Sequence, residues 1–152
     1  MKKLFTLILA ILVLAGSSLT VLAANSTGGQ TTITANVEPT YTVVIPANTT
    51  VDFNANQTAF GAIEVTAAQI HSNMCIKVTL TSDGKLENTL DADKIIPYTI
   101  QDSEGNVFTS ATYLTKGDKT VLSIHITQDD WNAAYAGNYT DTVTFTVSYV
   151  NK

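Results

Sequence analysis

The chain has 152 residues, enough for one domain with a single hydrophobic core. It contains thirteen acidic residues, eight lysines and no arginine. Recognition of phosphate groups relies on arginine and on basic patches, so this composition excludes nucleic acid as an expected partner. Cys75 is the only cysteine, which excludes an intramolecular disulfide.

The first 24 residues have the order of a secretory signal peptide. Lys2 and Lys3 precede an apolar run over 4–15, and small residues follow, with cleavage sites after Ala23 or Ala24. The run is shorter than the roughly 20 apolar residues of a membrane span, which disfavours the alternative of a retained membrane anchor. We therefore expect removal of residues 1–24, a flexible leader over 25–30 and one secreted domain over 31–152 without a membrane span.

The segment TTITANV at 31–37 alternates polar residues with Ile33 and Val37. It has two interpretations. It is either the first strand of its own sheet or an assembly strand that is donated to another subunit. The candidate assembly residues are Thr31, Thr32, Ile33, Thr34 and Val37. Only two strong apolar anchors are present, which favours the first interpretation.

Alternation of apolar and polar residues with a period of two predicts strands along most of the remaining chain. The threonine-rich composition supports them, because β-branched side chains suit a pleated sheet. Turn sequences such as SDGK and KGDK separate the segments. The predicted strands are 41–46, 50–54, 61–67, 74–80, 94–101, 106–110, 120–126 and 140–150. Eight or nine short strands at this spacing predict an all-β fold, an immunoglobulin-like antiparallel β-sandwich.

One stretch, ITQDDWNAAYAGNY, interrupts this pattern. Thr127 and Asp130 have the spacing of a capping box, and the stretch predicts a short helical turn near 128–135 that ends before Gly137. Trp131 is expected to pack this turn over one end of the sandwich. The alternative is an exposed Trp131 on which a sugar ring stacks.

Residues suited to catalysis or metal binding are sparse. His71 and His125 have no paired spacing and no neighbouring cysteine ligands, so no zinc site is expected. DSEGN at 102–106 is expected to be a solvated turn rather than a calcium loop. Cys75 is expected to be a partly buried side chain, with covalent dimerisation as the alternative if it is exposed. We expect no enzymatic activity, no metal and no cofactor.

The chain ends on the long alternating segment AGNYTDTVTFTVSY. We expect this strand to run through the centre of a sheet, with Val143, Phe145, Val147 and Tyr149 in the core. Together with TVLSIHIT and VEPTYTVVIPA, this ending resembles small secreted bacterial β-sandwich proteins, namely spore coat protein U-like and fimbrial (pilin-like) subunits. The resemblance implies a structural role outside the cell or at its surface.

These observations lead to two hypotheses on function. The first is a secreted extracellular or cell-surface structural protein, adhesive or self-assembling, whose partners are other copies of itself or other surface proteins. The alternative is a soluble carbohydrate- or peptide-binding module, in which Trp131, Tyr135 and Tyr113 are the candidate stacking residues.

Overall fold

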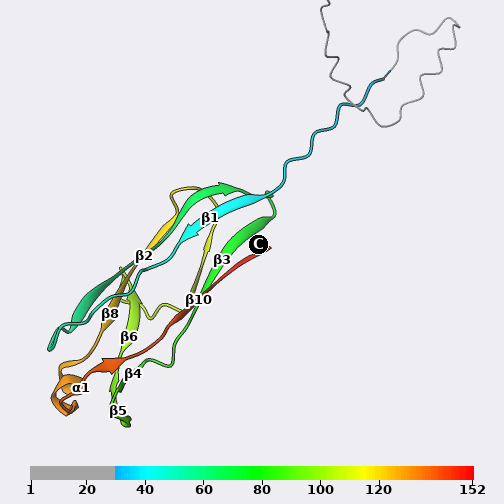
Figure 1. Cartoon of the computed structure of the whole chain (residues 1–152). Coiled ribbons are helices and arrows are strands. Elements are labelled where there is room, and N and C mark those ends of the chain that lie inside the picture. Colours follow the sequence, from blue (N-terminus) through cyan, green and yellow to red (C-terminus); the bar gives the residue numbers. More distant parts are fainter. Residues whose placement is uncertain (1–29) are drawn as a thin grey trace, which may run out of the picture. The chain divides into compact units, whose positions relative to one another are not determined.

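The computed structural model describes residues 30–152, and the predicted signal peptide and most of the leader lie outside these residues. Residues 36–152 form one compact folded unit, which is distinct from the residues up to Ala35. The folded unit contains ten strands and one short helix (Figure 1). In chain order these are β1 Thr40–Val44, β2 Gln57–Gln69, β3 Met74–Thr81, β4 Lys85–Asn88, β5 Asp91–Pro97, β6 Thr99–Asp102, β7 Ser110–Tyr113, β8 Lys119–His125, α1 Gln128–Ala133, β9 Tyr139–Thr140 and β10 Thr144–Asn151.

The strands form three antiparallel sheets. Four strands make one sheet in the order β1-β2-β8-β6, and three make a second in the order β10-β3-β7. A small third sheet has the order β5-β4-β9. This architecture confirms the predicted all-β sandwich with one short helix.

The core lies between the two larger sheets and consists mainly of β-branched and aromatic side chains. Most of its fully buried members come from strands of the two larger sheets, as the alternation predicts for half-buried antiparallel strands. They include Ile63 and Val65 from β2, Ile76 and Val78 from β3, Leu122 from β8, and Ile96 and Ile126. The predicted inward residues of 74–80 and 120–126 thus lie on the correct face.

The helix α1 begins as the sequence predicts. Thr127 is its N-cap, and the Thr127 hydroxyl oxygen accepts the backbone N–H of Asp130 at 3.2 Å. Trp131 is buried, and its Nε1–H donates to the Ala55 carbonyl oxygen at 3.1 Å. The helix ends at Ala133, two residues earlier than a Gly137 terminator requires, so the predicted role of Gly137 is wrong.

Three of the predicted strands are absent from the described residues, namely 31–37, 50–54 and 106–110. The segment 106–110 contains only an isolated bridge from Val107 to Gln101 and the first residue of β7, Ser110. The segment 31–37 lies in no strand, and the first strand begins at Thr40, after Pro39. The interpretation of 31–37 as the first strand of its own sheet is therefore wrong. The segment 50–54 is also not a strand, because it ends in a turn in which the Ala55 N–H donates to the Asp52 carbonyl at 3.0 Å and Asn54 has a φ of 64°.

The final strand lies at an edge of its sheet rather than at the centre. In the described structure β10 pairs along its full length with β3, from Thr144 opposite Thr81 to Asn151 opposite Met74, and is the terminal member of its sheet. The expectation of a central strand is wrong because alternation reports only which face of a strand is apolar. It carries no information on how many neighbours the strand has.

Candidate functional site: an open groove between two sheet edges

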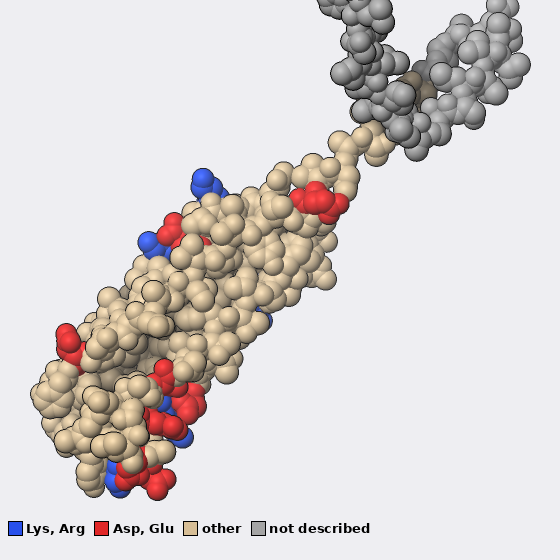
Figure 2. All heavy atoms as spheres, viewed as in Figure 1, with Lys and Arg blue, Asp and Glu red and all other residues tan. Residues whose placement is uncertain are grey.

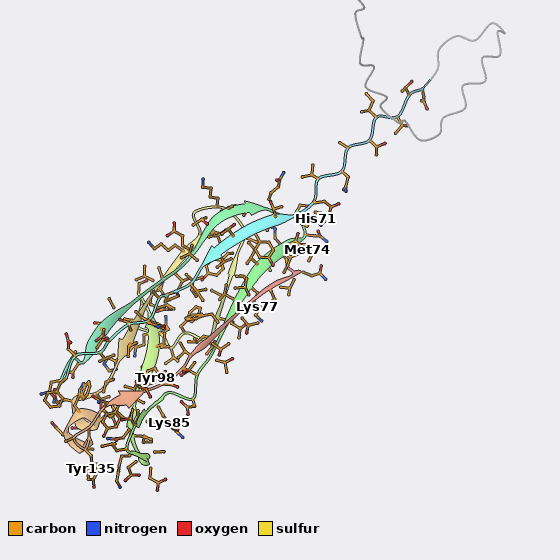
Figure 3. The ribbon with its side chains drawn as sticks, in the orientation of Figure 1. His71, Met74, Lys77, Lys85, Tyr98 and Tyr135 are labelled. Atoms are coloured by element: carbon orange, nitrogen blue, oxygen red, sulfur yellow. The ribbon has the colours of Figure 1, made fainter. Side chains whose placement is uncertain are left out.

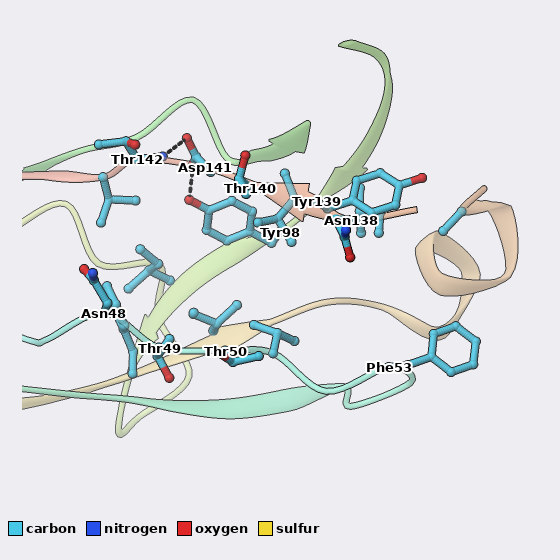
Figure 4. Close-up of a pocket in the computed structure, with 18 of the residues that line it drawn as sticks. Asn48, Thr49, Thr50, Phe53, Tyr98, Asn138, Tyr139, Thr140, Asp141 and Thr142 are labelled. Carbon is cyan, nitrogen blue, oxygen red and sulfur yellow. Dashed lines mark hydrogen bonds between the residues drawn. The ribbon is translucent and has the colours of Figure 1, made fainter. Parts of the chain in front are cut away.

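A groove with a volume of about 1100 Å³ opens along one side of the sandwich. One wall is the segment 45–51 that follows β1, and the other is the segment 134–143 that leads into β10 (Figure 4). The floor consists of core side chains from the sheets and the helix, including Ile96, Tyr98, Ile124 and Trp131. The groove therefore gives access to the hydrophobic core itself.

The groove lies where the edges of two different sheets face each other. β1 is the terminal strand of the four-stranded sheet, and β10 is the terminal strand of the second sheet. The ring centroids of Tyr41 on β1 and Tyr149 on β10 are 5.7 Å apart, and those of Phe60 and Phe145 are 6.0 Å apart. The sandwich is thus open on this side, with an edge strand of each sheet beside the opening.

The core-facing side chains of β10 are incompletely covered. Val147 is 37% exposed, whereas its cross-strand partner Val78 on the same face is fully buried. Phe145 and Tyr149 are half-buried. Complete burial of a side chain of this kind is worth roughly 1.5–3 kcal/mol relative to full exposure, so covering this row would stabilise the fold.

One polar cluster interrupts the apolar lining. The Tyr98 hydroxyl donates to an Asp141 carboxylate oxygen and lies 2.9 Å from the Ser82 hydroxyl oxygen. The Thr142 N–H donates to the other Asp141 oxygen at 2.5 Å. Burial, reinforced by the hydrogen bond to Asp141, raises the pKa of the Tyr98 hydroxyl well above its ordinary value. Tyr98 is therefore a neutral hydrogen-bond donor at physiological pH, and it fixes Asp141 at the groove wall.

A close contact with β4 holds the second wall in place. The Thr89 N–H donates to the Asn138 carbonyl oxygen at 2.8 Å, and Glu87 and Asn88 pair with Thr140 and Tyr139. A Cβ atom at Gly137 would lie 2.3 Å from Nδ2 of the buried Asn88 side chain. Glycine is therefore required at position 137 for this close approach.

The groove carries almost no charge. Asp141 is the only aspartate, glutamate, lysine or histidine among its lining residues. In the face shown by Figure 2, charged side chains gather mainly toward the end that carries α1 and β5, and the middle is largely uncharged. An apolar, elongated opening beside an unpaired strand edge suits an extended polypeptide, which can add backbone hydrogen bonds and fill apolar pockets with alternate side chains.

The three candidate stacking residues do not form one exposed surface. Trp131 and Tyr113 are 8% and 3% exposed, and the Tyr113 hydroxyl donates to the Thr120 hydroxyl at 2.8 Å. Tyr135 is 63% exposed and receives the Lys94 ammonium at 4.9 Å from its ring centroid. Only Tyr135 is thus accessible to a ligand, near the end of the sandwich opposite to His71 (Figure 3).

The other chemically notable residues are distributed over the fold. Cys75 is buried, so it is not positioned for the alternative of covalent dimerisation. The backbone N–H of His71 donates to the Tyr149 hydroxyl oxygen at 2.8 Å, whereas His125 is on β8. Residues 30–152 contain no group of three His, Cys, Asp or Glu side chains that could hold a metal ion. They also contain no helix with the length and apolarity of a membrane span.

The candidate assembly residues Thr31, Thr32, Ile33, Thr34 and Val37 are all exposed. Sequence reasoning identified them but missed the groove. One signal for the groove is present in the final segment. Asp141 lies two and four residues before Val143 and Phe145, and in an extended strand these three residues are on the same side. A carboxylate therefore occupies a position in the core-facing row. Such a position is tolerated only where the row opens to solvent or meets a polar partner.

No family model and no curated protein matches the chain, so nothing supports the likeness to spore coat protein U-like subunits. One similar solved structure is described as "Chaperone-tip adhesin complex is vital for synergistic activation of CFA/I fimbriae biogenesis". The match has 13% sequence identity and a TM-score of 0.41, and it covers 74% of this chain and 42% of that chain. The chain thus spans less than half the length of the structure that it matches.

Proposed function

We propose that this chain is a secreted, self-assembling structural protein in which residues 31–37 of one copy fill the groove of another copy. The observation that carries the proposal is the exposed core-facing row of β10, at a strand edge beside an apolar groove. A donated strand would pair with this edge and cover the row. The predicted signal peptide supports a location outside the cell or at its surface.

The segment 31–37 has the features that the groove requires. Ile33 is 93% exposed and Val37 is 57% exposed, so both apolar side chains are available to a partner. In an extended conformation Ile33, Ala35 and Val37 share one side, and Thr32, Thr34 and Asn36 share the other. One side can enter the apolar groove while the polar side remains in water.

The lengths also agree. A strand of the seven residues 31–37 spans about 23 Å. The segment 141–147, which includes the groove wall and the start of β10, has the same number of residues. A strand paired along this wall would place apolar side chains over Val143, Phe145 and Val147, and it would avoid a second charge beside Asp141.

Two complementary defects provide a direct test. Ile33→Asp places a charge on the donated strand, and Val147→Lys places one at the receiving edge. Each variant alone should lose the polymers that the wild-type protein forms at rising concentration. Their equimolar mixture should form a one-to-one complex, because Ile33→Asp retains a functional groove and Val147→Lys retains a functional segment 31–37. Light scattering and electron microscopy would measure both results.

Matched controls use the opposite faces of the same segments. Thr34→Asp lies on the polar side of the segment 31–37, and Thr146→Lys lies on the exposed face of β10. Both should assemble like the wild-type protein. A wild-type chain that remains monomeric at all concentrations, or a mixture that yields no complex, would contradict the proposed function.

A carbohydrate- or peptide-binding function is the second candidate. Phe53 and Tyr135, which are 77% and 63% exposed, line the groove near α1 and offer aromatic faces. Binding of soluble oligosaccharides to a monomeric protein, abolished by Tyr135→Ala, would favour this candidate over assembly.

A further inference from the structure

We propose that Tyr41 and Tyr149 are a site of oxidative cross-linking, at which a carbon–carbon bond between the two rings joins the two larger sheets. The inference is independent of the proposed function. Three observations carry it, namely the contact between the two rings, their partial exposure, and the position of the two residues on terminal strands of different sheets.

The two rings are the only tyrosine pair in ring contact among residues 30–152. Their centroids are 5.7 Å apart and their planes are tilted by 32°. At such a separation aromatic rings pack directly against each other. All six tyrosines of the chain lie within the described residues. Coupling of two tyrosines within one chain therefore has a single candidate pair in this fold.

The accessibility of the tyrosines favours the same pair. Tyr41 and Tyr149 are half-buried, so a small oxidant can reach both rings. Tyr98 and Tyr113 are 8% and 3% exposed and are shielded by the core. Tyr135 is 63% exposed, but no other tyrosine ring packs against it. Only the pair on β1 and β10 combines access with a partner ring.

The Tyr149 ring is held in place through its hydroxyl oxygen. The backbone N–H of His71 donates to this oxygen at 2.8 Å, and the centroid of the His71 ring lies 6.4 Å from that of Tyr149. Because the oxygen is the acceptor in this bond, the phenolic proton is not used in it. The ring is thus positioned against Tyr41 while the proton that oxidation must remove stays free to leave to water.

The reaction balances with a peroxide as the oxidant and a heme peroxidase as its catalyst. One electron is removed from each phenol, and each hydroxyl releases its proton, which gives two tyrosyl radicals. Their unpaired density lies partly on the ring carbons next to the C–O bond, and a bond forms between one such carbon of each ring. The hydrogens on these two carbons leave as protons, and the two oxygens are protonated again. In total the protein loses two hydrogen atoms, and one hydrogen peroxide is reduced to two water molecules.

The new bond would close one end of the open side of the sandwich. Tyr41 is on β1 and Tyr149 is on β10, and each strand is the terminal member of its sheet. Neither residue lines the groove, so the groove itself stays accessible. With Cys75 as the only cysteine, no intramolecular disulfide can connect the sheets. The link encloses most of the folded unit, and a covalent link that closes so long a loop stabilises mainly by constraining the unfolded chain.

Treatment of the secreted protein with a heme peroxidase and hydrogen peroxide, at low protein concentration, tests the proposal. The intact mass should fall by two hydrogen atoms, and the blue fluorescence of dityrosine should appear. Peptide mapping should yield a cross-linked pair that contains residues 41 and 149. The melting temperature should rise by roughly 10 °C, as expected for a covalent link across a long loop. The map of the wild-type product identifies the bonded residues whether or not a variant folds.

Conservative variants provide the controls. Tyr41→Phe and Tyr149→Phe each keep the ring and remove the hydroxyl, so both should abolish the intrachain product and the rise in melting temperature. Tyr135→Phe, at an exposed position, should change neither. Ile33→Asp should also cross-link like the wild-type chain, so a failure of this proposal is distinguishable from a failure of the proposed function.

Three results would overturn the proposal. The first is a wild-type chain that stays uncoupled under conditions that couple free tyrosine. The second is an intrachain product that persists in Tyr41→Phe. The third is a product formed only between chains and lost in Tyr135→Phe, which would assign the reactivity to the most exposed tyrosine instead.

Discussion

Val147 and Val78 are directly opposite each other on the core face of neighbouring strands, yet Val78 is fully buried and Val147 is 37% exposed. The difference arises because Val78 has neighbouring strands on both sides and Val147 has one. The same residue type in the same row therefore has two environments. Val78 is part of the closed core, and Val147 remains partly accessible at the sheet edge.

This pair makes a prediction for stability. Val78→Ala should lower the free energy of unfolding of the monomer by about 2 kcal/mol, because it removes fully buried methyl groups. Val147→Ala should lower it by less than about 1 kcal/mol in the monomer. Urea denaturation of both variants measures the difference, in an Ile33→Asp background that, on the proposed function, prevents assembly. Equal losses would show that β10 is covered in the monomer.

The buried Tyr98 predicts a loss of stability in alkali. Its pKa is raised in the folded state, so its contribution to stability is fully present below the unfolded pKa of about 10 and is lost as the pH rises above that value. Tyr98→Phe should remove this part of the pH dependence. It should also cost about 1–2 kcal/mol near neutral pH through the lost bonds to Asp141 and Ser82. Unfolding followed between pH 8 and 11 checks both effects, with Tyr135→Phe at an exposed position as the control.

Asp118 predicts a loss of stability in acid. Its carboxylate accepts the N–H groups of Leu114 and Thr115 at 2.7 and 3.0 Å, and these bonds lower its pKa in the folded state. The contribution is present above the unfolded pKa of about 4 and is lost as the pH falls through the lower folded value. Asp118→Asn should therefore lower the free energy of unfolding at pH 7. It should also reduce the change of this free energy with pH below pH 4. Asp93→Asn, at an exposed position of β5, should change neither.

The helix cap predicts a local effect. Thr127→Ala removes the acceptor for the Asp130 N–H and should cost about 1 kcal/mol. Because α1 holds Trp131 over the core, thermal unfolding monitored by tryptophan fluorescence should report the loss. Gln128→Ala, at the adjacent exposed position, is the matched control and should have little effect on the melting temperature.

The buried thiol predicts slow labelling. Cys75 is 4% exposed, and its Sγ lies 3.9 Å from the Asn151 carbonyl oxygen. A thiol-reactive chromophore should label the native protein slowly and the urea-unfolded protein at once. Rapid labelling of the native state would show that the end of β10 opens readily from β3.

Local interactions account for what the sequence alone determined about this protein. Thr127 caps α1 because the hydroxyl and the N–H that it accepts are three residues apart, and this spacing can be read directly. The faces of β3 and β8 follow from alternation, since residues two apart in a strand share a side. The all-β sandwich follows from many such segments separated by turns.

Long-range pairing decided the rest. Alternation assigns Val147 to the core face but cannot show that no strand covers its free edge, because the neighbours of β10 are set by residues far away in the chain. In the same way, an apolar alternating segment at 31–37 becomes a strand only where a partner supplies its backbone hydrogen bonds. The tertiary structure alone therefore revealed the groove, because a groove is defined by which two edges meet and by what remains uncovered between them.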